Sequence, residues 1–154
     1  MKGAVDTQTS TSRAGQGWVY IVVAVLSLIG LADAIYLTIE HITGQSVRCT
    51  IIAGCSEVLS SAYAVIGGIP VAMIGAFAYF IVFSLAILFL FGYTFTRLPL
   101  VLLVAGMFIA TLWFVYLQAF VIRAFCQFCL LSAAVTTLIA ICVLCDLTCK
   151  VFRK

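Results

Sequence analysis

Four long apolar runs dominate this chain and constrain what it can fold into. Each is about 20 residues or longer, which is the length that a helix needs to cross the hydrocarbon core of a bilayer. Hydrophobic residues make up 66% of the 154 residues and charged residues only 8%, which is more apolar surface than a soluble domain of this size can bury. Strands of a membrane barrel would appear as shorter alternating segments, so the runs predict helices. The expected fold is an all-α integral membrane protein.

The runs divide the chain into one transmembrane domain with short polar ends. Residues 1–16 are polar and small, and they are predicted to form a flexible cytoplasmic tail. A four-helix transmembrane bundle is expected over residues 17–149, followed by a basic cytoplasmic tail over 150–154. The four spans are predicted at about 18–39, 69–91, 99–120 and 125–145.

Residues 40–68 form the sizeable loop between the first two predicted spans. Apolar residues in this loop follow roughly helical spacing behind a cap at Ser56: Val58, Leu59, Tyr63 and Ile66. The spacing predicts a short interfacial helix on the outer side of the membrane. The pair Gly67-Gly68 is expected to end this helix before the second span begins.

The distribution of Lys and Arg predicts the orientation of the spans. One side of the membrane would carry six of these residues: Lys2, Arg13, Arg97, Lys150, Arg153 and Lys154. The other side would carry only Arg48 and Arg123. Because the more basic side faces the cytoplasm, both termini are expected there. The 40–68 loop and the start of the fourth span then share the outer, oxidising side.

This orientation brings four of the seven cysteines to one face of the membrane: Cys49, Cys55, Cys126 and Cys129. Cys126 and Cys129 form a Cys-x-x-Cys pair at the start of a helix, where the helix dipole and free amides favour a thiolate. Arg123 adds a nearby cation. The residues permit a relay by thiol–disulfide exchange between the two pairs. Structural disulfides and a four-cysteine zinc site are the alternatives.

Asp33 is an ionisable residue inside the first predicted span. Charged groups are costly inside a bilayer, so an intramembrane carboxyl is a candidate functional group. Two interpretations stay open for it: it relays a proton during a redox reaction, or it is a protonated side chain hydrogen-bonded between helices.

Two segments carry a resemblance to a known family. The segment 54–75 reads GCSEVLSSAYAVIGGIPVAMIG, with Cys49 before it, and the segment 126–132 reads CQFCLLS. Together they resemble the vitamin K epoxide reductase family, especially its bacterial members, and the resemblance covers about residues 18–145. It implies a four-helix transmembrane bundle that surrounds a quinone.

The resemblance also implies a role for each matching residue. Cys49 is similar to the outer cysteine that meets a thioredoxin-fold partner, and Cys55 to its mate, which exchanges with Cys126. Cys129 is similar to the thiol that faces the quinone, and Ser61 falls on a family serine near that site. Further candidates for the quinone wall are apolar residues near this site: Phe125, Met73, Phe77 and Phe80.

The family implies an enzyme of the bacterial inner membrane, a quinone-dependent thiol oxidoreductase that supports disulfide-bond formation. Its active-site cysteines would lie on the periplasmic side, its electron acceptor would be ubiquinone or menaquinone, and no metal is expected. Many bacterial relatives carry a fused thioredoxin-like domain after the fourth span. The sequence stops at Lys154, so the partner is expected to be a separate periplasmic protein.

Two departures from the family pattern bear on the substrate. Where animal epoxide reductases carry Asn and Tyr, this sequence has Val71 and Ala133. The departures favour plain quinone reduction over reduction of a quinone epoxide, which is the first alternative function. The alternative of another class is a non-catalytic membrane subunit with structural disulfides.

Overall fold

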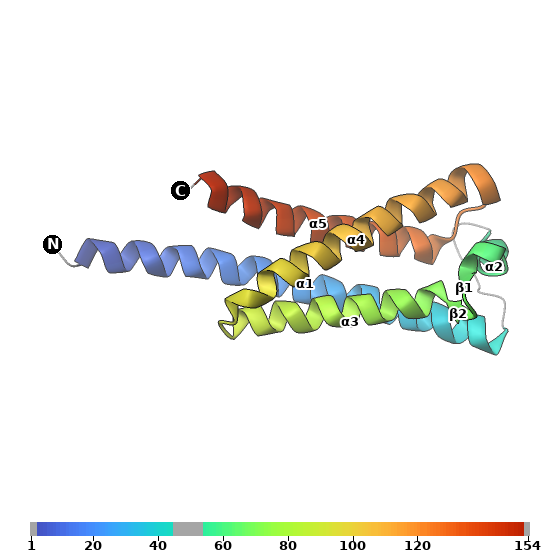
Figure 1. Ribbon diagram of the computed structural model, residues 1–154, viewed down its shortest axis with the longest axis horizontal. Helices are drawn as coiled ribbons and strands as arrows, with labels where there is room; N and C mark the ends of the chain where they lie inside the picture. The colour runs from blue at the N-terminus through green and yellow to red at the C-terminus, as the bar shows by residue number, and fades with distance from the viewer. Residues whose placement is uncertain (1–2, 45–53, 153–154) are drawn as a thin grey trace.

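The computed structural model describes the backbone of residues 3–44 and 54–152, and side chains within 17–44 and 54–149. Its helices are α1 Gly3–Thr43, α2 Cys55–Leu59, α3 Val71–Leu90, α4 Arg97–Tyr116 and α5 Gln127–Phe152. The four long helices run side by side in an elongated bundle, with both termini at one end and α2 at the other (Figure 1). We call the α2 end the cysteine end and the opposite end the far end.

Four segments are long and apolar enough to cross a membrane: Gly17–Thr43, Val71–Leu90, Thr94–Ile122 and Gln127–Cys149. The prediction of an all-α membrane protein with four spans is therefore confirmed. The third segment combines three elements, namely η2 Thr94–Thr96, α4 and the π-helical η3 Leu117–Ile122. Gly92, with φ of +98°, allows the tight reversal between α3 and η2.

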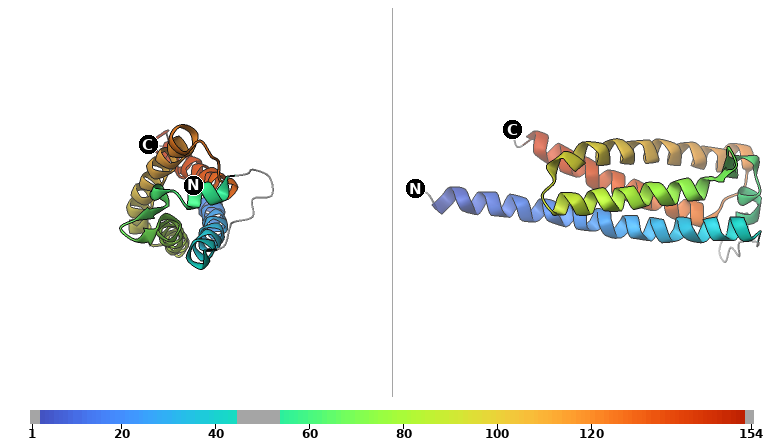
Figure 2. Two further views of the ribbon diagram at one scale, coloured as in Figure 1. Left: turned by 90° about the vertical axis from the view of Figure 1, so that its right-hand side faces the viewer. Right: turned by 60° about the horizontal axis from the view of Figure 1, so that its bottom comes forward.

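The first helix begins much earlier than the sequence predicts. Residues 3–16, expected to be a flexible tail, continue α1 as a helix that projects past the turn between α3 and α4 (Figure 2, right). The stretch contains no proline, and extending an existing helix costs far less free energy than nucleating a new one.

The cysteine end is closed by irregular structure rather than by one longer helix. The helix α2 begins at Cys55, one residue before the predicted cap Ser56, and ends at Leu59. The segment up to Ile66, predicted to be helical, instead forms the 3₁₀ turn η1 Ala62–Ala64 and the strand β1 Val65–Ile66. A strand β2 Ile69–Pro70 pairs antiparallel with β1. Gly67 and Gly68 both have positive φ, which a two-residue hairpin turn of type I′ requires.

Close packing of α1 against α3 defines the middle of the bundle. Tyr79 of α3 is 1% exposed, and its ring lies against Gly30 of α1. A Cβ at Gly30 would overlap this ring, so only glycine leaves room for it. The buried core continues toward the far end through apolar residues of all four long helices, among them Val23, Val82, Leu100 and Ile139.

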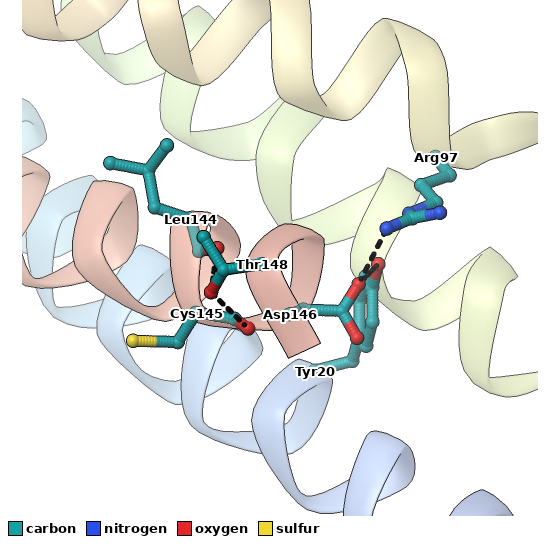
Figure 3. Close-up of polar contacts among 6 residues, drawn as sticks. All are labelled: Tyr20, Arg97, Leu144, Cys145, Asp146 and Thr148. Atoms are coloured by element: carbon teal, nitrogen blue, oxygen red, sulfur yellow. Dashed lines mark hydrogen bonds and ion pairs between the residues drawn. The ribbon is translucent and has the colours of Figure 1, made fainter. Parts of the chain in front are cut away.

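A polar cluster ties three helices together at the far end (Figure 3). Asp146 of α5 is buried, and its Oδ2 atom lies 3.3 Å from Nη2 of Arg97 at the start of α4. The Tyr20 hydroxyl of α1 donates a hydrogen bond to the same oxygen at 3.3 Å. Thr148, two residues nearer the C-terminus, donates only to carbonyls of its own helix, those of Leu144 and Cys145.

Candidate active site

Cys126 lies in the short connection between η3 and α5, at the cysteine end. The π-helical turn of η3 is followed by Arg123, which adopts the left-handed conformation with φ of 56° and ψ of 29°. This combination reverses the chain within the four residues between η3 and α5. Cys126 is the last of these four, directly before the first residue of α5, Gln127. Single π-helical turns are rare and often lie at functional sites.

Three atoms of Cys126 take part in hydrogen bonds. Its Sγ accepts a hydrogen bond from the backbone N–H of Cys129 at 3.5 Å, as the side chain of an N-cap residue does. Its carbonyl oxygen accepts from the N–H of Leu130 at 3.0 Å. Its own N–H donates to Oε1 of Gln118 in η3 at 3.1 Å. The thiol that the sequence placed at a helix N-terminus is therefore held in the capping position.

The capping position alters the acidity of the thiol. A hydrogen bond from the Cys129 side chain, together with the backbone N–H groups of Cys129 and Phe128, lowers the pKa of Cys126 to about 7, while burial opposes this effect. Arg123, which the sequence suggested as a contributing cation, has an exposed side chain and is not among the groups that lower this pKa. The pKa of Cys126 is therefore lowered by hydrogen bonds from the first turn of α5 and not by the cation that the sequence suggested.

Cys55 and Cys126 belong to one buried cluster, together with Val58 and Ala124. Both cysteines are almost completely buried, with exposures of 1% and 0%. Gly54, with φ of +136°, lets the chain lie against the loop that precedes α5, because a Cβ there would be 3.0 Å from the carbonyl oxygen of Phe125. The two cysteines, far apart in sequence, are thereby packed into the same small core.

The cysteines of the two segments are in different covalent states. Cys55 is disulfide-bonded, whereas Cys126 and Cys129 are free thiols. Cys49, the predicted outer cysteine, lies outside the described residues. Within those residues, no group of three His, Cys, Asp or Glu side chains could hold a metal ion.

A cavity of about 380 Å³ lies beside Cys129, between the four long helices and the η1 segment. Its wall is mainly apolar, and it includes the predicted residues Cys129, Asp33 and Ser61. Asp33 is 7% exposed, and neither of its carboxylate oxygens has a hydrogen-bond partner among the described residues. A buried carboxyl without a hydrogen-bond partner is costly, which makes Asp33 a candidate functional group.

Hydroxyl groups form a second polar feature of the cavity. The Tyr79 hydroxyl donates to the Ser132 carbonyl oxygen at 3.0 Å and is also within hydrogen-bond distance of two side-chain hydroxyls, Ser132 Oγ at 2.8 Å and Thr136 Oγ1 at 2.7 Å. Cys129, Ser132 and Thr136 are spaced by three and four residues, so they lie along one face of α5. All four residues line the cavity.

Comparison with known protein families agrees with this arrangement. The model of the vitamin K epoxide reductase family matches residues 21–144, which is most of the chain. The chain belongs to this family. Membership identifies it as a membrane oxidoreductase, and proteins of the vitamin K epoxide reductase family use quinones in general.

Four residues predicted to contact the quinone do not line the cavity: Met73, Phe77, Phe80 and Phe125. Phe77 and Phe80 are exposed on the outer surface of α3, at 65% and 55%, and Phe125 is exposed at 40%. The wall contributed by α3 comes from the opposite face, which carries Gly75, Ala78 and Tyr79. A span that is apolar on every side gives no sequence signal for which face points inward.

Sequence reasoning assigned no role to Gln118, Tyr79, Ser132 and Thr136. Two signals in the sequence could have identified three of them, all but Tyr79. Gln118 is a polar side chain inside an apolar run, which inside a bilayer is costly unless it has a partner. Ser132 and Thr136 repeat at helical spacing after Cys129, so they must share its face of the helix.

Proposed function

We propose that this member of the vitamin K epoxide reductase family oxidises the dithiol of a thioredoxin-fold partner and passes the electrons to a quinone. The observation that carries the proposal is the placement of the cysteines. Cys126 packs with Cys55 on one side and caps the helix turn that holds Cys129, and Cys129 lines the cavity. The cysteines thus lead from the cysteine end of the bundle into its interior.

The proposed relay consists of thiol–disulfide exchanges followed by one oxidation. The partner's dithiol reduces the outer disulfide of Cys49 and Cys55 and becomes a disulfide itself. The Cys55 thiolate then attacks the sulfur of Cys126 in a Cys126–Cys129 disulfide, and Cys129 leaves as a thiolate. Attack of Cys49 on Cys55 releases Cys126 and restores the outer disulfide. The inner pair is now a dithiol that carries two electrons.

The low pKa of Cys126 suits both of its roles in this relay. A thiolate that is stable near neutral pH is a good leaving group, so the bond between Cys55 and Cys126 breaks readily when Cys49 attacks. The same thiolate is the form that exchanges again when electrons flow in the opposite direction. The direction of net flow then depends on the partner and the acceptor rather than on Cys126.

The cavity fits the head group of a quinone, either ubiquinone or menaquinone. Its wall is mainly apolar, with a few polar groups that converge on one side, as in most small-molecule sites. When bound, the quinone would accept the two electrons and two protons released as Cys126 and Cys129 return to the disulfide. Asp33 and the Tyr79 hydroxyl are the groups of this chain placed to hold or deliver a proton at the cavity wall.

Two positions in the cavity wall favour a quinone over a quinone epoxide as the substrate. Val71 and Ala133, which replace the polar residues of animal epoxide reductases, both line the cavity. Neither can donate a hydrogen bond or a proton to an epoxide oxygen. The cavity therefore lacks, at those places, the groups that the family's epoxide reductases present there.

The same proposal includes the orientation predicted from the basic residues. The cysteine end would face the periplasm and both termini the cytoplasm of an inner membrane. The thioredoxin-fold partner would then meet the outer pair of cysteines on the periplasmic side.

The decisive experiment supplies purified protein with a reduced thioredoxin-fold protein and either ubiquinone or menaquinone. The wild type should oxidise the partner and reduce the quinone in equal amounts, and Cys129→Ser should abolish quinone reduction. Cys129→Ser should still oxidise about one equivalent of the partner and then stop with its outer pair reduced, because exchange at the outer pair does not need Cys129 but its re-oxidation does.

Cys145→Ser is the matched control, because Cys145 is a free, exposed cysteine on the same helix, near the far end. It should leave both reactions unchanged. Cysteines that stay in one redox state while partner and quinone are varied would instead support a structural role. Turnover of a quinone epoxide at the rate of the quinone would favour the alternative substrate.

A further inference from the structure

The position of Cys126 depends on one contact that comes from outside α5. Its Sγ and carbonyl oxygen interact with Cys129 and Leu130 of the helix that it caps. Its backbone N–H instead donates to Oε1 of Gln118, eight residues earlier in η3. Gln118 is 3% exposed, so this hydrogen bond is formed away from solvent. Such a buried N–H is costly to leave without an acceptor.

The local fold is built to bring these two residues together. The π-helical turn of η3 and the left-handed Arg123 reverse the chain between Gln118 and Cys126. Gln118 also lines the cavity, as do Cys129 and Asp33. A polar side chain thus joins the cavity wall to the backbone of the cysteine that packs against Cys55.

From this geometry we propose that Gln118 is a positioning residue, which holds Cys126 between Cys55 and Cys129 and keeps its sulfur in the capping position. The inference deepens the proposed thiol relay and rests on it for its biological role. Thiol exchange requires the attacking sulfur to approach along the bond that breaks, so small displacements slow it strongly. Gln118 fixes the backbone from which the central sulfur of that exchange projects.

The test compares replacements of Gln118 that differ in whether they can still accept this hydrogen bond. Gln118→Leu has a similar volume and no acceptor, and Gln118→Asn keeps the amide but is one methylene shorter. Gln118→Glu keeps both the length and an acceptor oxygen. Thr137→Val is the matched control, because Thr137 is a half-buried residue of α5 outside the cavity wall that donates only to the carbonyl of Ala133.

The first readout is the titration of the Cys126 thiolate, which needs neither partner nor quinone. It is followed by the ultraviolet absorbance of the thiolate, as the difference from a Cys126→Ser variant of the same background. In wild type the midpoint should lie at about pH 7. Without the Gln118 contact the cap loosens, so Gln118→Leu and Gln118→Asn should shift the midpoint toward about 8.5, the ordinary value for cysteine. Thr137→Val should keep the wild-type midpoint. In Gln118→Glu the added carboxyl itself disfavours the nearby thiolate, as the Asp33 carboxyl does, so this variant is judged by the exchange rate alone.

The second readout starts from protein whose inner pair is the Cys126–Cys129 disulfide. It is the rate at which the Cys55–Cys126 bond forms, with Cys129 leaving as a thiolate, after the partner's dithiol reduces the outer pair, measured by acid trapping. We expect it to fall by about tenfold or more in the Leu and Asn variants and to be rescued in the Glu variant. If Gln118 had only a structural role, its replacement would leave the titration midpoint of Cys126 unchanged. The Glu variant would then not recover the exchange rate that the Leu and Asn variants lose. The inference is overturned if the Asn variant titrates and exchanges like wild type, or if Thr137→Val shows the same changes.

These measurements separate this inference from the proposed function. If the wild type exchanges thiols but reduces no quinone, the relay to quinone is wrong while the role of Gln118 is still decided by the thiolate midpoint. If quinone reduction proceeds and Gln118→Asn is indistinguishable from wild type in both readouts, the proposed function stands and the positioning role is wrong.

Discussion

At the scale of single residues, Asp33 is the group whose environment most needs an explanation. Its two carboxylate oxygens are buried without a hydrogen-bond partner among the described residues, beside a cavity that also holds Cys129. A buried carboxyl without hydrogen-bond partners lowers the stability of the fold. Retaining it is reasonable if the carboxyl gives a proton to a ligand during turnover.

We therefore predict that Asp33→Asn, which preserves shape but cannot give up a proton, slows quinone reduction by about 100-fold, the lower part of the range for general acid–base catalysis. Initial rates of quinone reduction across a pH series measure the effect. The part of the pH dependence that is due to the Asp33 carboxyl should be absent in the variant. Exchange between Cys55 and Cys126 should be unaffected. Glu40→Gln, on the same helix outside the cavity wall, should behave as wild type. An Asn variant with the wild-type rate at every pH would remove the proton role.

At the scale of elements, the contact between α1 and α3 is the tightest interhelical fit near the cavity. Gly30 leaves no space for a Cβ beside the ring of Tyr79, whereas Gly17, on the same helix, would meet nothing within 4 Å. Tyr79 cannot easily retreat, because its hydroxyl is held by Ser132 and Thr136 of α5. A methyl group at Gly30 must therefore separate the helices or break these hydrogen bonds.

We predict that Gly30→Ala lowers the free energy of unfolding by about 1–3 kcal/mol, the usual cost of overpacking. Gly17→Ala should be neutral or slightly stabilising, because alanine favours the helix. Thermal unfolding of both variants in detergent measures the difference. Quinone affinity should fall only in the Gly30 variant, because the added methyl group would displace Tyr79, which lines the cavity. Equal melting temperatures for the two variants would show that α1 moves away from α3 without cost.

The elements also show which parts of the site a sequence can predict. The four spans and the place of Cys126 at a helix N-terminus could be predicted from apolar run length and from the position of the Cys-x-x-Cys motif. The inward faces of the spans did not, because Phe77 and Phe80 are as apolar as the residues that line the cavity. The hydrogen bond between Gln118 and Cys126 could not be predicted from the sequence either. It depends on a π-helical turn and on the left-handed conformation of Arg123, for which no residue pattern is diagnostic.

At the scale of the whole molecule, the bundle has chemically different ends. The cysteine end holds Cys126, Cys129 and the cavity, while the far end holds the cluster of Tyr20, Arg97 and Asp146 (Figure 3). Residues 126 and 146 are separated by 20 positions of helix, which corresponds to about 30 Å at 1.5 Å per residue. Apolar core residues, among them Val135 and Ile139, lie between the two ends. The far-end cluster therefore serves to hold α1, α4 and α5 together rather than to take part in thiol chemistry.

We predict that Arg97→Met destabilises the bundle without altering the thiols. Removing one partner of a fully buried ion pair costs about 3–5 kcal/mol, and because the Arg97 side chain is 29% exposed we expect about 2–3 kcal/mol here. The double variant Arg97→Met/Asp146→Leu should recover most of this loss, since an apolar pair needs no desolvation of charge. Thermal unfolding measures the loss and its recovery, and the titration midpoint of Cys126 should stay at about pH 7 in both variants. A shifted midpoint in Arg97→Met would instead mean that the far end controls the geometry of the cysteines through the length of α5.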